Sequence, residues 1–354
     1  DLNASRTETK AHSIQYQYEG MPRTQSGSFT MTTISLSSAF ESMGDANSGY
    51  PSAVFDRFCD ALPEFQAKAS AAYGEQVDQL SAAVIIPAFI DSYTGSGGGK
   101  LDFFPALTRL LPNWTLRYSG LSKLTWFLER FKSVNLNHAY KSILSIGSYT
   151  TSSATTSVLG WNVPTVSINE SFSPLLGADV TLQNSMTIKC EYRTSRTLAL
   201  STTSVQIIET RSNDWVIGLG YKLSDFYIFG SGASRKIKKA QGGKGKKAAD
   251  EEKSASSKSS SSKSRGVNHD LNMRLDLTLR DQAAITRDIA SRTSSASSGN
   301  RALKISFMAD YTLSRLLTMS FYYDRQTNTP LLSASSYPTT TRDFGLSLKF
   351  SLTR

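Results

Sequence analysis

The chain has 354 residues and is 39% hydrophobic, with 55 serines, 33 threonines, 15 tyrosines, 17 phenylalanines and 4 tryptophans. This aromatic content argues against disorder through most of the chain, and the Ser and Thr content is typical of many strands that each have one wet face. The formal charge of +10 is concentrated in residues 235–265, which hold eleven Lys or Arg against three acids and no interleaved aromatics, so nucleic-acid binding is not expected.

Strand-like alternation, with an apolar residue at every second position, recurs along the chain. In the N-terminal third it is clear at 13–19 and 113–119, and weaker at 26–38. Residues 51–80 break the alternation and predict a helix with one apolar stripe, and 84–93 predicts a short second helix. These two segments are expected to form a helical insertion between strands.

The middle of the chain returns to alternation after another short predicted helix at 122–131. Clear strands are predicted at 184–193 and 214–224, where the apolar side chains oppose charged residues or glycines. Weaker strand candidates lie at 133–147, 164–173, 178–183 and 197–205.

The C-terminal part contains the plainest example of the pattern. In NHDLNMRLDLTLRD, residues 268–281, the apolar side chains from Leu271 to Leu279 point one way and the polar ones point the other way. About twelve strands are predicted in all, many near the 9 to 11 residues that a tilted membrane strand requires. The remaining strands of this kind lie at 302–313, 317–324 and 344–352.

The apolar faces of these strands need a cover, because leaving large apolar side chains in water costs roughly 1.5–3 kcal/mol each. A second sheet would cover them in a soluble sandwich, and lipid would cover them in a membrane barrel. Aromatic residues at the ends of the apolar faces and charged residues or glycines on the opposite faces favour lipid. The longest apolar run, 82–90, is shorter than the ~18 residues of a membrane helix.

Signals for catalysis are weak throughout the sequence, so an enzyme is not expected and no cofactor is implied. The segment TGSGGGKL, 94–101, is one residue short of a phosphate-binding P-loop and has Leu101 where Mg²⁺ would need a hydroxyl. The three histidines lie far apart, and no metal-ligand spacing appears. Cys59 and Cys190 are 131 positions apart, and we expect two unpaired thiols, with a single long-range disulfide as the alternative.

Several long strings resemble the C-terminal region of the SprA/Sov family, the outer-membrane translocon of the type IX secretion system of Bacteroidetes. The resemblance covers residues 100–354 well and the first hundred residues weakly. The strings are GLSKLTWFLERFKSVNLNHAYKS (120–142), VSINESFSPLLGADVTLQNSMTIKCEYRTSRTLALS (166–201), RSNDWVIGLGYKL (211–223), NHDLNMRLDLTLRDQAAITRDI (268–289) and YTLSRLLTMSFYYDRQTNTPLLSASSYPTTTRDFGLSLKFSLTR (311–354).

The resemblance implies a very large single-chain transmembrane antiparallel β-barrel in the outer membrane, which exports folded cargo proteins and supports gliding motility in some relatives. The twelve strands would then be an arc of that barrel. The implied partners are outer-membrane lipid, cargo bearing a C-terminal signal, an outer-membrane shuttle barrel, a periplasmic plug and the remaining N-terminal part of the same barrel. The family has no catalytic residues to carry over.

Two features depart from what the resemblance leads us to expect. The chain ends in SLTR, whereas barrel assembly signals commonly end in an aromatic residue, and the nearest one here is Phe350. The Lys/Ser-rich stretch at 235–265 is long and basic for this family.

The expected organisation follows from these assignments. The lumen of the barrel would be hydrated by charges of mixed sign, which is unlike a selective ion filter. The candidate lumen-facing residues are Lys189, Glu191, Arg193, Arg274, Asp276, Arg280 and Lys349. The predicted division is barrel strands at 1–50, a helical insertion at 51–100, barrel strands at 101–230, a disordered Lys/Ser-rich loop at 231–266 and C-terminal barrel strands at 267–354.

Topology follows from placing the C-terminus in the periplasm, as is usual for such barrels. The segments 326–341 and 281–300 are then external loops, and 313–315 and 225–266 are periplasmic. Two alternatives remain open: a complete twelve-stranded outer-membrane porin or transporter that closes on itself, and a soluble β-rich surface binding module. The second would leave the membrane fraction without detergent.

Overall fold

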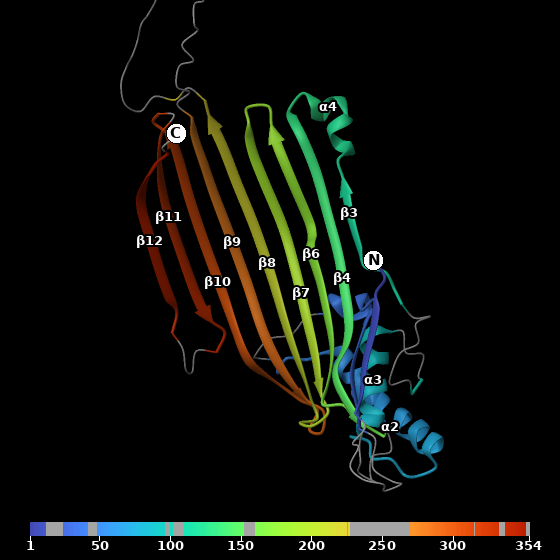
Figure 1. Ribbon diagram of the computed structural model, residues 1–354. Coiled ribbons are helices and arrows are strands. Elements are labelled where there is room, and N and C mark those ends of the chain that lie inside the picture. Colours follow the sequence, from blue (N-terminus) through green and yellow to red (C-terminus); the bar gives the residue numbers. More distant parts are fainter. Residues whose placement is uncertain are drawn as a thin grey trace, which may run out of the picture.

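The computed structural model describes one large, open, antiparallel sheet of twelve strands with a few helices (Figure 1). The described residues are 1–11, 24–41, 48–95, 100–101, 110–151, 160–224, 226, 270–314, 316–332 and 337–351. The strands are β1 (Ala4–Ala11), β2 (Thr24–Thr32), β3 (Trp114–Tyr118), β4 (Phe131–Thr151), β5 (Trp161–Asn162), β6 (Thr165–Leu182), β7 (Met186–Ser201), β8 (Gln206–Leu223), β9 (Leu271–Asp288), β10 (Thr293–Thr312), β11 (Leu317–Pro330) and β12 (Thr339–Phe350).

The strand order is β1-β2-β4-β6-β7-β8-β9-β10-β11-β12, with β3 and β5 also paired to β4. Strands from β6 onward pair with their neighbours in sequence, because short turns at 183–185, 202–205 and 289–292 link several of them. Among the described strands, β1 and β12 lie at opposite edges and do not pair with each other. The sheet is therefore an arc, and these strands do not close into a barrel by themselves.

Several strands are longer than predicted, because the backbone pairing continues through polar segments that lack a clear apolar alternation. The predicted strands 164–173 and 178–183 are one strand, β6, with an irregularity between Phe172 and Leu176. Likewise, 184–193 and 197–205 merge into β7, with residues 202–205 forming a turn. The predicted loop at 281–300 is wrong, since β9 and β10 pair through most of it.

The N-terminal region differs from the prediction in a similar way. The strand expected at 13–19 lies outside the described residues, and a strand that was not predicted, β1, precedes it. The candidate at 26–38 is β2 followed by a short helix, α1 (Leu36–Ala39). The Lys/Ser-rich loop expected at 231–266 also lies outside the described residues.

The helices predicted at 51–80 and 84–93 are confirmed as α2 (Ala53–Tyr73) and α3 (Ala82–Thr94). The short helix predicted at 122–131 is α4 (Thr125–Leu128), which lies at the other end of β4. Helix α2 begins at Ser52, whose hydroxyl accepts a hydrogen bond from the Phe55 amide at 3.1 Å. It ends at Gly74, whose φ of 75° is the left-handed conformation that a residue without Cβ adopts freely.

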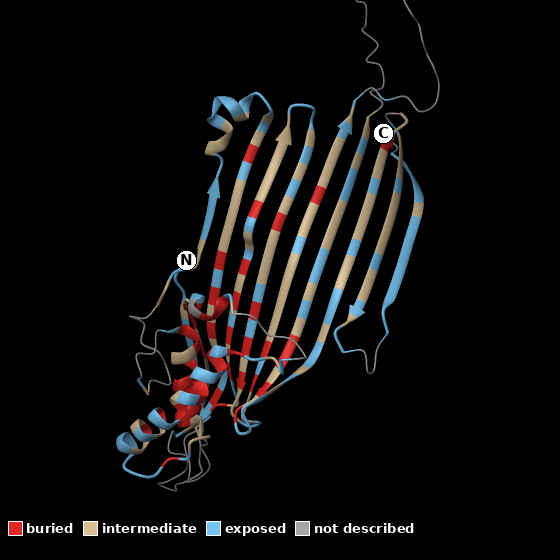
Figure 2. Ribbon diagram, turned by 180° about the vertical axis from the view of Figure 1, so that it is seen from behind, coloured by how far each residue is buried: buried red, intermediate tan, exposed pale blue. Residues whose placement is uncertain are grey.

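Helices α1, α2 and α3, which we call the helical lobe, cover one end of one face of the sheet (Figure 2). Apolar side chains from β2, β4, β6 and β7 pack against them in a continuous core. Fully buried members include Phe58, Phe89, Ile146, Ile168 and Leu198. We call this the lobe end of the sheet; the end that carries α4 and Ser351 is the far end (Figure 1).

Candidate functional site

The strand register assigns every side chain of the sheet to one of two faces, because directly paired residues point to the same side. The face that carries the helical lobe also carries the predicted leucine row. Leu277 pairs with Ile217 on β8 and with Ile305 on β10, and Leu275 pairs with Leu219 and Phe307. The apolar side chains of neighbouring strands therefore form one continuous band between the lobe and the far end.

This apolar band has the height of a membrane core. On β9 it runs from Leu271 to Leu279, and on β8 and β10 it runs over the paired residues. Nine residues at roughly 3.3–3.4 Å per step span about 27 Å, close to the ~25 Å apolar band of outer-membrane barrels. The band comprises Leu176, Ala178, Val180 and Leu182 on β6; Met186, Ile188, Cys190 and Tyr192 on β7; Trp215, Ile217, Leu219, Tyr221 and Leu223 on β8; Leu271, Met273, Leu275, Leu277 and Leu279 on β9; Leu303, Ile305, Phe307, Ala309 and Tyr311 on β10; Leu317, Met319, Phe321 and Tyr323 on β11; and Phe344, Leu346, Leu348 and Phe350 on β12.

Most of the band has no protein cover within the described residues. Phe344 is 72% exposed, Leu346 62% and Trp215 48%. Figure 2 shows that the helical lobe covers the sheet at the lobe end and leaves the rest of this face bare. A second sheet, which the soluble alternative would require, is absent from the described part of the chain. An apolar surface of this extent marks an interaction site.

Aromatic side chains border the band, as they do at the two surfaces of a membrane. At the margin near the lobe, Trp114 packs against Tyr140 at 4.5 Å and Tyr192 packs against Trp215 at 4.6 Å, between the centroids of mutually tilted rings. On β11 and β12 this margin lies closer to the far end of the sheet. Tyr323 of β11 pairs with Phe307 of β10, whereas the band on β10 continues toward the lobe as far as Leu303. Such a drift is expected when strands tilt relative to the membrane normal. Aromatic residues of the far margin are Tyr221, Tyr311 and Phe350.

The opposite face of the sheet, which we call the polar face, carries all seven of the predicted lumen-facing residues. They are Lys189, Glu191 and Arg193 on β7; Arg274, Asp276 and Arg280 on β9; and Lys349, which pairs in register with Thr318 of β11. Their place on one face is a matter of register; that the face borders a lumen remains a prediction.

Ion pairs link many of these charges along and across the strands. Lys189 lies 2.9 Å from the Glu191 carboxylate, which also contacts Arg193, and Arg274 lies 2.6 Å from Asp276. Arg280 makes two hydrogen bonds, of 2.9 and 3.0 Å, to Asp214 of β8, a partner that the sequence prediction missed. A groove of about 520 Å³ on β6 to β9 is lined by Lys189, Arg274 and Asp276 among others.

Glycines on β8 create the room for this groove. A Cβ on Gly220 would lie 2.4 Å from Oγ1 of Thr187, and a Cβ on Gly218 would lie 3.1 Å from Oδ1 of Asp276. At these two positions β8 presents only backbone between the side chains of β7 and β9.

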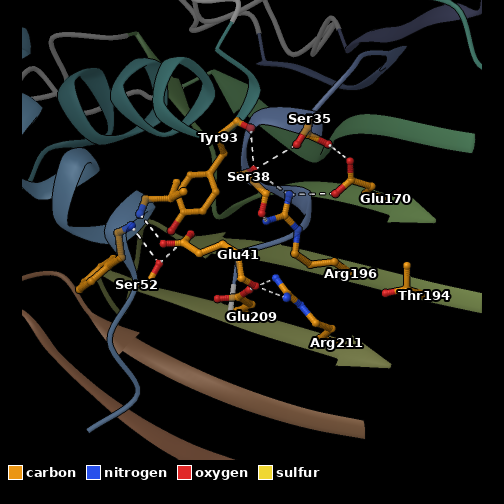
Figure 3. Close-up of polar contacts among 12 residues, drawn as sticks. Ser35, Ser38, Glu41, Ser52, Tyr93, Glu170, Thr194, Arg196, Glu209 and Arg211 are labelled. Carbon is orange, nitrogen blue, oxygen red and sulfur yellow. Dashed lines mark hydrogen bonds and ion pairs between the residues drawn. The ribbon is translucent and has the colours of Figure 1, made fainter. Parts of the chain in front are cut away.

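A group of buried charges that the sequence prediction missed separates the apolar band from the core of the helical lobe. We call it the charged belt, and Figure 3 shows most of it. Arg196 pairs with Glu170 at 2.9 Å, with both side chains at most 4% exposed, and Arg287 pairs with Glu209 at 2.9 Å. The belt comprises Glu170, Arg196, Glu209, Arg211 and Arg287.

The Glu170 carboxylate is fully partnered. It accepts hydrogen bonds from the Tyr140 hydroxyl at 2.7 Å, the Ser35 hydroxyl at 2.9 Å and the Arg196 guanidinium. A buried charge pair needs such additional hydrogen bonds, because its mutual attraction alone does not offset desolvation. Ser35 precedes α1, so this pair ties the lobe to β6 and β7.

Arginines of the sheet also hold the lobe by its backbone. Arg196 and Arg211 donate to the carbonyl oxygens of Ser38 and Glu41. On β9, Arg287 donates to the carbonyl oxygen of Tyr50 at 2.7 Å. Arg292, in the β9–β10 turn, donates to the carbonyl oxygen of Cys59 at 3.0 Å. The backbone that leads into α2 is thus attached to successive strands of the sheet.

A sequence signal for the belt existed, although it was weak. On β6, Glu170 takes the place in the alternation between Ile168 and Phe172, and Arg287 follows Ile285 in the same way on β9. A charge within an apolar row requires a partner from another element, and the alternation does not say which element supplies it.

Both cysteines are free, as expected. Cys59 is buried in α2, and burial raises the pKa of its thiol to about 11, against the opposing effect of Arg292. We therefore expect iodoacetamide to alkylate Cys59 at pH 8 about a thousandfold more slowly than a fully ionised thiol, with the rate rising about tenfold per pH unit. Peptide mass spectrometry of the native protein measures this rate. Alkylation as fast as in the urea-unfolded chain would contradict the burial.

No described helix is long and apolar enough to cross a membrane. Nor do the described residues include a group of three or more His, Cys, Asp or Glu side chains that could hold a metal ion. No protein-family profile and no curated protein sequence matches the chain. The resemblance to the type IX translocon family therefore remains a prediction.

Proposed function

We propose that this chain is a transmembrane arc of a large outer-membrane barrel that conducts proteins in type IX secretion. One observation carries the membrane part of this proposal: a single face of the sheet bears an uncovered apolar band about 27 Å high, bordered by aromatic residues. Lipid is the cover that this height and these margins fit.

The polar face supports a water-filled passage. Its charges have both signs and are largely paired with each other, as between Lys189 and Glu191 or Arg280 and Asp214. A wall of this kind stays hydrated and offers few apolar contacts to a passing protein. Within the described strands, the charges of this face do not form the row of a single sign that characterises an ion filter.

The open edges of the sheet support an arc within a larger barrel. Among the described strands, β3 and β12 lie at the two edges at the height of the band, and each pairs on one side only. A strand edge in lipid is costly unless another strand pairs with it. We propose that the remaining N-terminal part of the same barrel supplies the pairing strands. The self-closed porin or transporter would need the two edges of the sheet to pair with each other, and the described strands β1 and β12 do not pair.

The position of the band supports an orientation. The far end, with Ser351 and the short turn 183–185, follows the band directly, whereas the lobe end extends well beyond it. In such barrels the periplasmic turns are short and the longer segments lie outside the cell. Short turns also occur at the lobe end, at 202–205 and 289–292, so the extension of the lobe end beyond the band carries the assignment. We propose that the far end faces the periplasm and that the helical lobe lies outside the cell, against the outer wall of the barrel. The β8–β9 connection departs from the short-turn rule.

The secretion role itself rests on the family resemblance, which also suggests the partners. These are cargo proteins with a C-terminal signal, a shuttle barrel in the outer membrane and a plug in the periplasm. The proposal includes no enzymatic activity and no cofactor.

The proposal is tested by fractionation and depletion in the native host. We expect the protein to stay in outer membranes through an alkaline carbonate wash and to need detergent for release. Depletion of its gene should leave cargo with C-terminal signals in the periplasm. Release by carbonate alone would favour a soluble surface module, and normal secretion after depletion of a membrane-embedded protein would favour a porin or transporter.

A further inference from the structure

We propose that residues 120–132, which lead from β3 into the first two residues of β4, form an interfacial anchor that inserts apolar side chains into the phospholipid leaflet at the far end of the sheet. The inference rests on the proposed membrane location of the apolar band and adds a second contact with the bilayer, one made by helical turns beyond the strands. The segment contains the 3₁₀ helix η2 (Gly120–Lys123) and α4.

The anchor exposes large apolar side chains without a protein cover. Leu124 is 53% exposed, Trp126 59% and Leu128 49%. Three such residues within five positions of one short helical turn are costly in water. Phe127 packs against Phe131 and meets the Trp126 ring edge-on, at 4.9 Å between ring centroids. About half or more of each of the three side chains still stays exposed.

The anchor is fixed at the far margin of the apolar band. Phe131 pairs in register with Leu182, the last band residue of β6. Next to it, the side-chain amide of Gln183 donates to the carbonyl oxygens of Leu128 and Phe131, at 3.0 and 3.3 Å. These contacts hold α4 beside the β6–β7 turn, where the hydrocarbon core would give way to headgroups.

The charges of the anchor suit the headgroup region. Lys123, Arg130 and Lys132 are exposed, against a single acid, Glu129. The Arg130 guanidinium lies 5.8 Å from the centre of the Trp126 ring. Tryptophan at the boundary with cations beside it is the composition of interfacial segments, because the ring sits at the headgroup level and the cations meet lipid phosphates.

Depth-dependent fluorescence quenching tests the anchor. The full-length protein and its Trp126→Phe variant are reconstituted in phosphatidylcholine–phosphatidylglycerol vesicles whose acyl chains carry bromine near the carbonyl end or near the methyl end. The difference between the two emission spectra isolates Trp126. A Trp215→Phe variant isolates a residue of the apolar band in the same way.

We expect bromine near the carbonyl end of the acyl chains to quench the Trp126 emission more strongly than bromine near the methyl end. Quenching of Trp215 without quenching of Trp126 would overturn the anchor and leave the membrane band intact, since a protein segment would then cover Trp126. If neither tryptophan is quenched, the membrane proposal itself fails.

A comparison of two triple variants tests the role of the cations in the anchor. Replacing Lys123, Arg130 and Lys132 together by glutamine should reduce the Trp126 quenching in vesicles that contain phosphatidylglycerol. A control triple variant neutralises three cations away from the anchor and should leave the quenching unchanged; a reduction of equal size in both variants would argue against headgroup binding. The control positions are Arg274, Lys304 and Lys349.

Discussion

Replacing Leu277 by arginine is expected to prevent stable assembly of the protein in the outer membrane, whereas Thr278→Arg, one residue further, leaves assembly near the wild-type level. Leu277 lies inside the apolar band, next to its middle residue Leu275 on the same face, and it pairs with Ile217 and Ile305. Thr278 points to the polar face between Val216 and Lys304. An arginine on the lipid face at the bilayer midplane costs about 2–4 kcal/mol, which corresponds to roughly a 30-fold to several-hundred-fold shift in the assembly equilibrium.

The measurement is the amount of each variant that remains in carbonate-washed outer membranes, relative to wild type. Thr278→Arg is a matched control, because it adds the same side chain to the same strand one position away. If both variants assemble equally well, the band does not face lipid. If Thr278→Arg is the more damaging change, the assignment of the two faces is reversed.

Removing the Arg287 side chain is expected to loosen the helical lobe from the sheet. Arg287 is 1% exposed, makes two hydrogen bonds of 2.9 and 3.1 Å to Glu209, and donates to the Tyr50 carbonyl oxygen. Arg287→Ala leaves the Glu209 carboxylate buried beside a cavity. Breaking a buried pair in this way costs about 3–5 kcal/mol, far more than the pair contributes relative to apolar replacements.

Hydrogen–deuterium exchange of the α2 and α3 amides measures the free energy of opening the lobe. We expect these amides to lose protection in Arg287→Ala and to regain most of it in the double variant Arg287→Leu with Glu209→Leu, which removes both charges. The control is Arg301→Ala. Arg301 pairs with Asp281 at 2.7 Å, but the side chains are 66% and 46% exposed, so its loss should cost at most about 1 kcal/mol. Equal effects of Arg287→Ala and Arg301→Ala would contradict a buried belt.

The strands and their faces could be predicted from the sequence wherever one face is uniformly apolar. The row from Leu271 to Leu279 lies on one face as expected, and the seven charged residues from Lys189 to Lys349 lie on the other. This follows because successive side chains of a strand point to opposite faces, so the alternation of apolar and polar residues assigns each residue to a face. The helices were predictable for the same local reason, from the apolar stripe that includes Phe55 and Phe58.

The ends of the strands were harder to predict where the polar character continues on both faces. Residues 281–300 are rich in Ser, Thr and charged side chains and lack the alternation, yet they pair across β9 and β10 nearly to the turn. Their strand conformation is stabilised by backbone hydrogen bonds to neighbours, and such bonds leave no mark in the amino-acid pattern.

The sequence by itself determined that the chain forms amphipathic strands, which side of each strand is apolar, and where helices interrupt them. Only the tertiary structure decided that the sheet is an open arc, that the helical lobe and the apolar band share one face, and that Glu170, Arg196, Glu209 and Arg287 lie between them as partnered charges. The physical reason is the sequence distance over which the interactions act. Periodicity is a property of consecutive residues. Arg287 and Tyr50 are 237 positions apart, and their hydrogen bond can form only after the strands have paired.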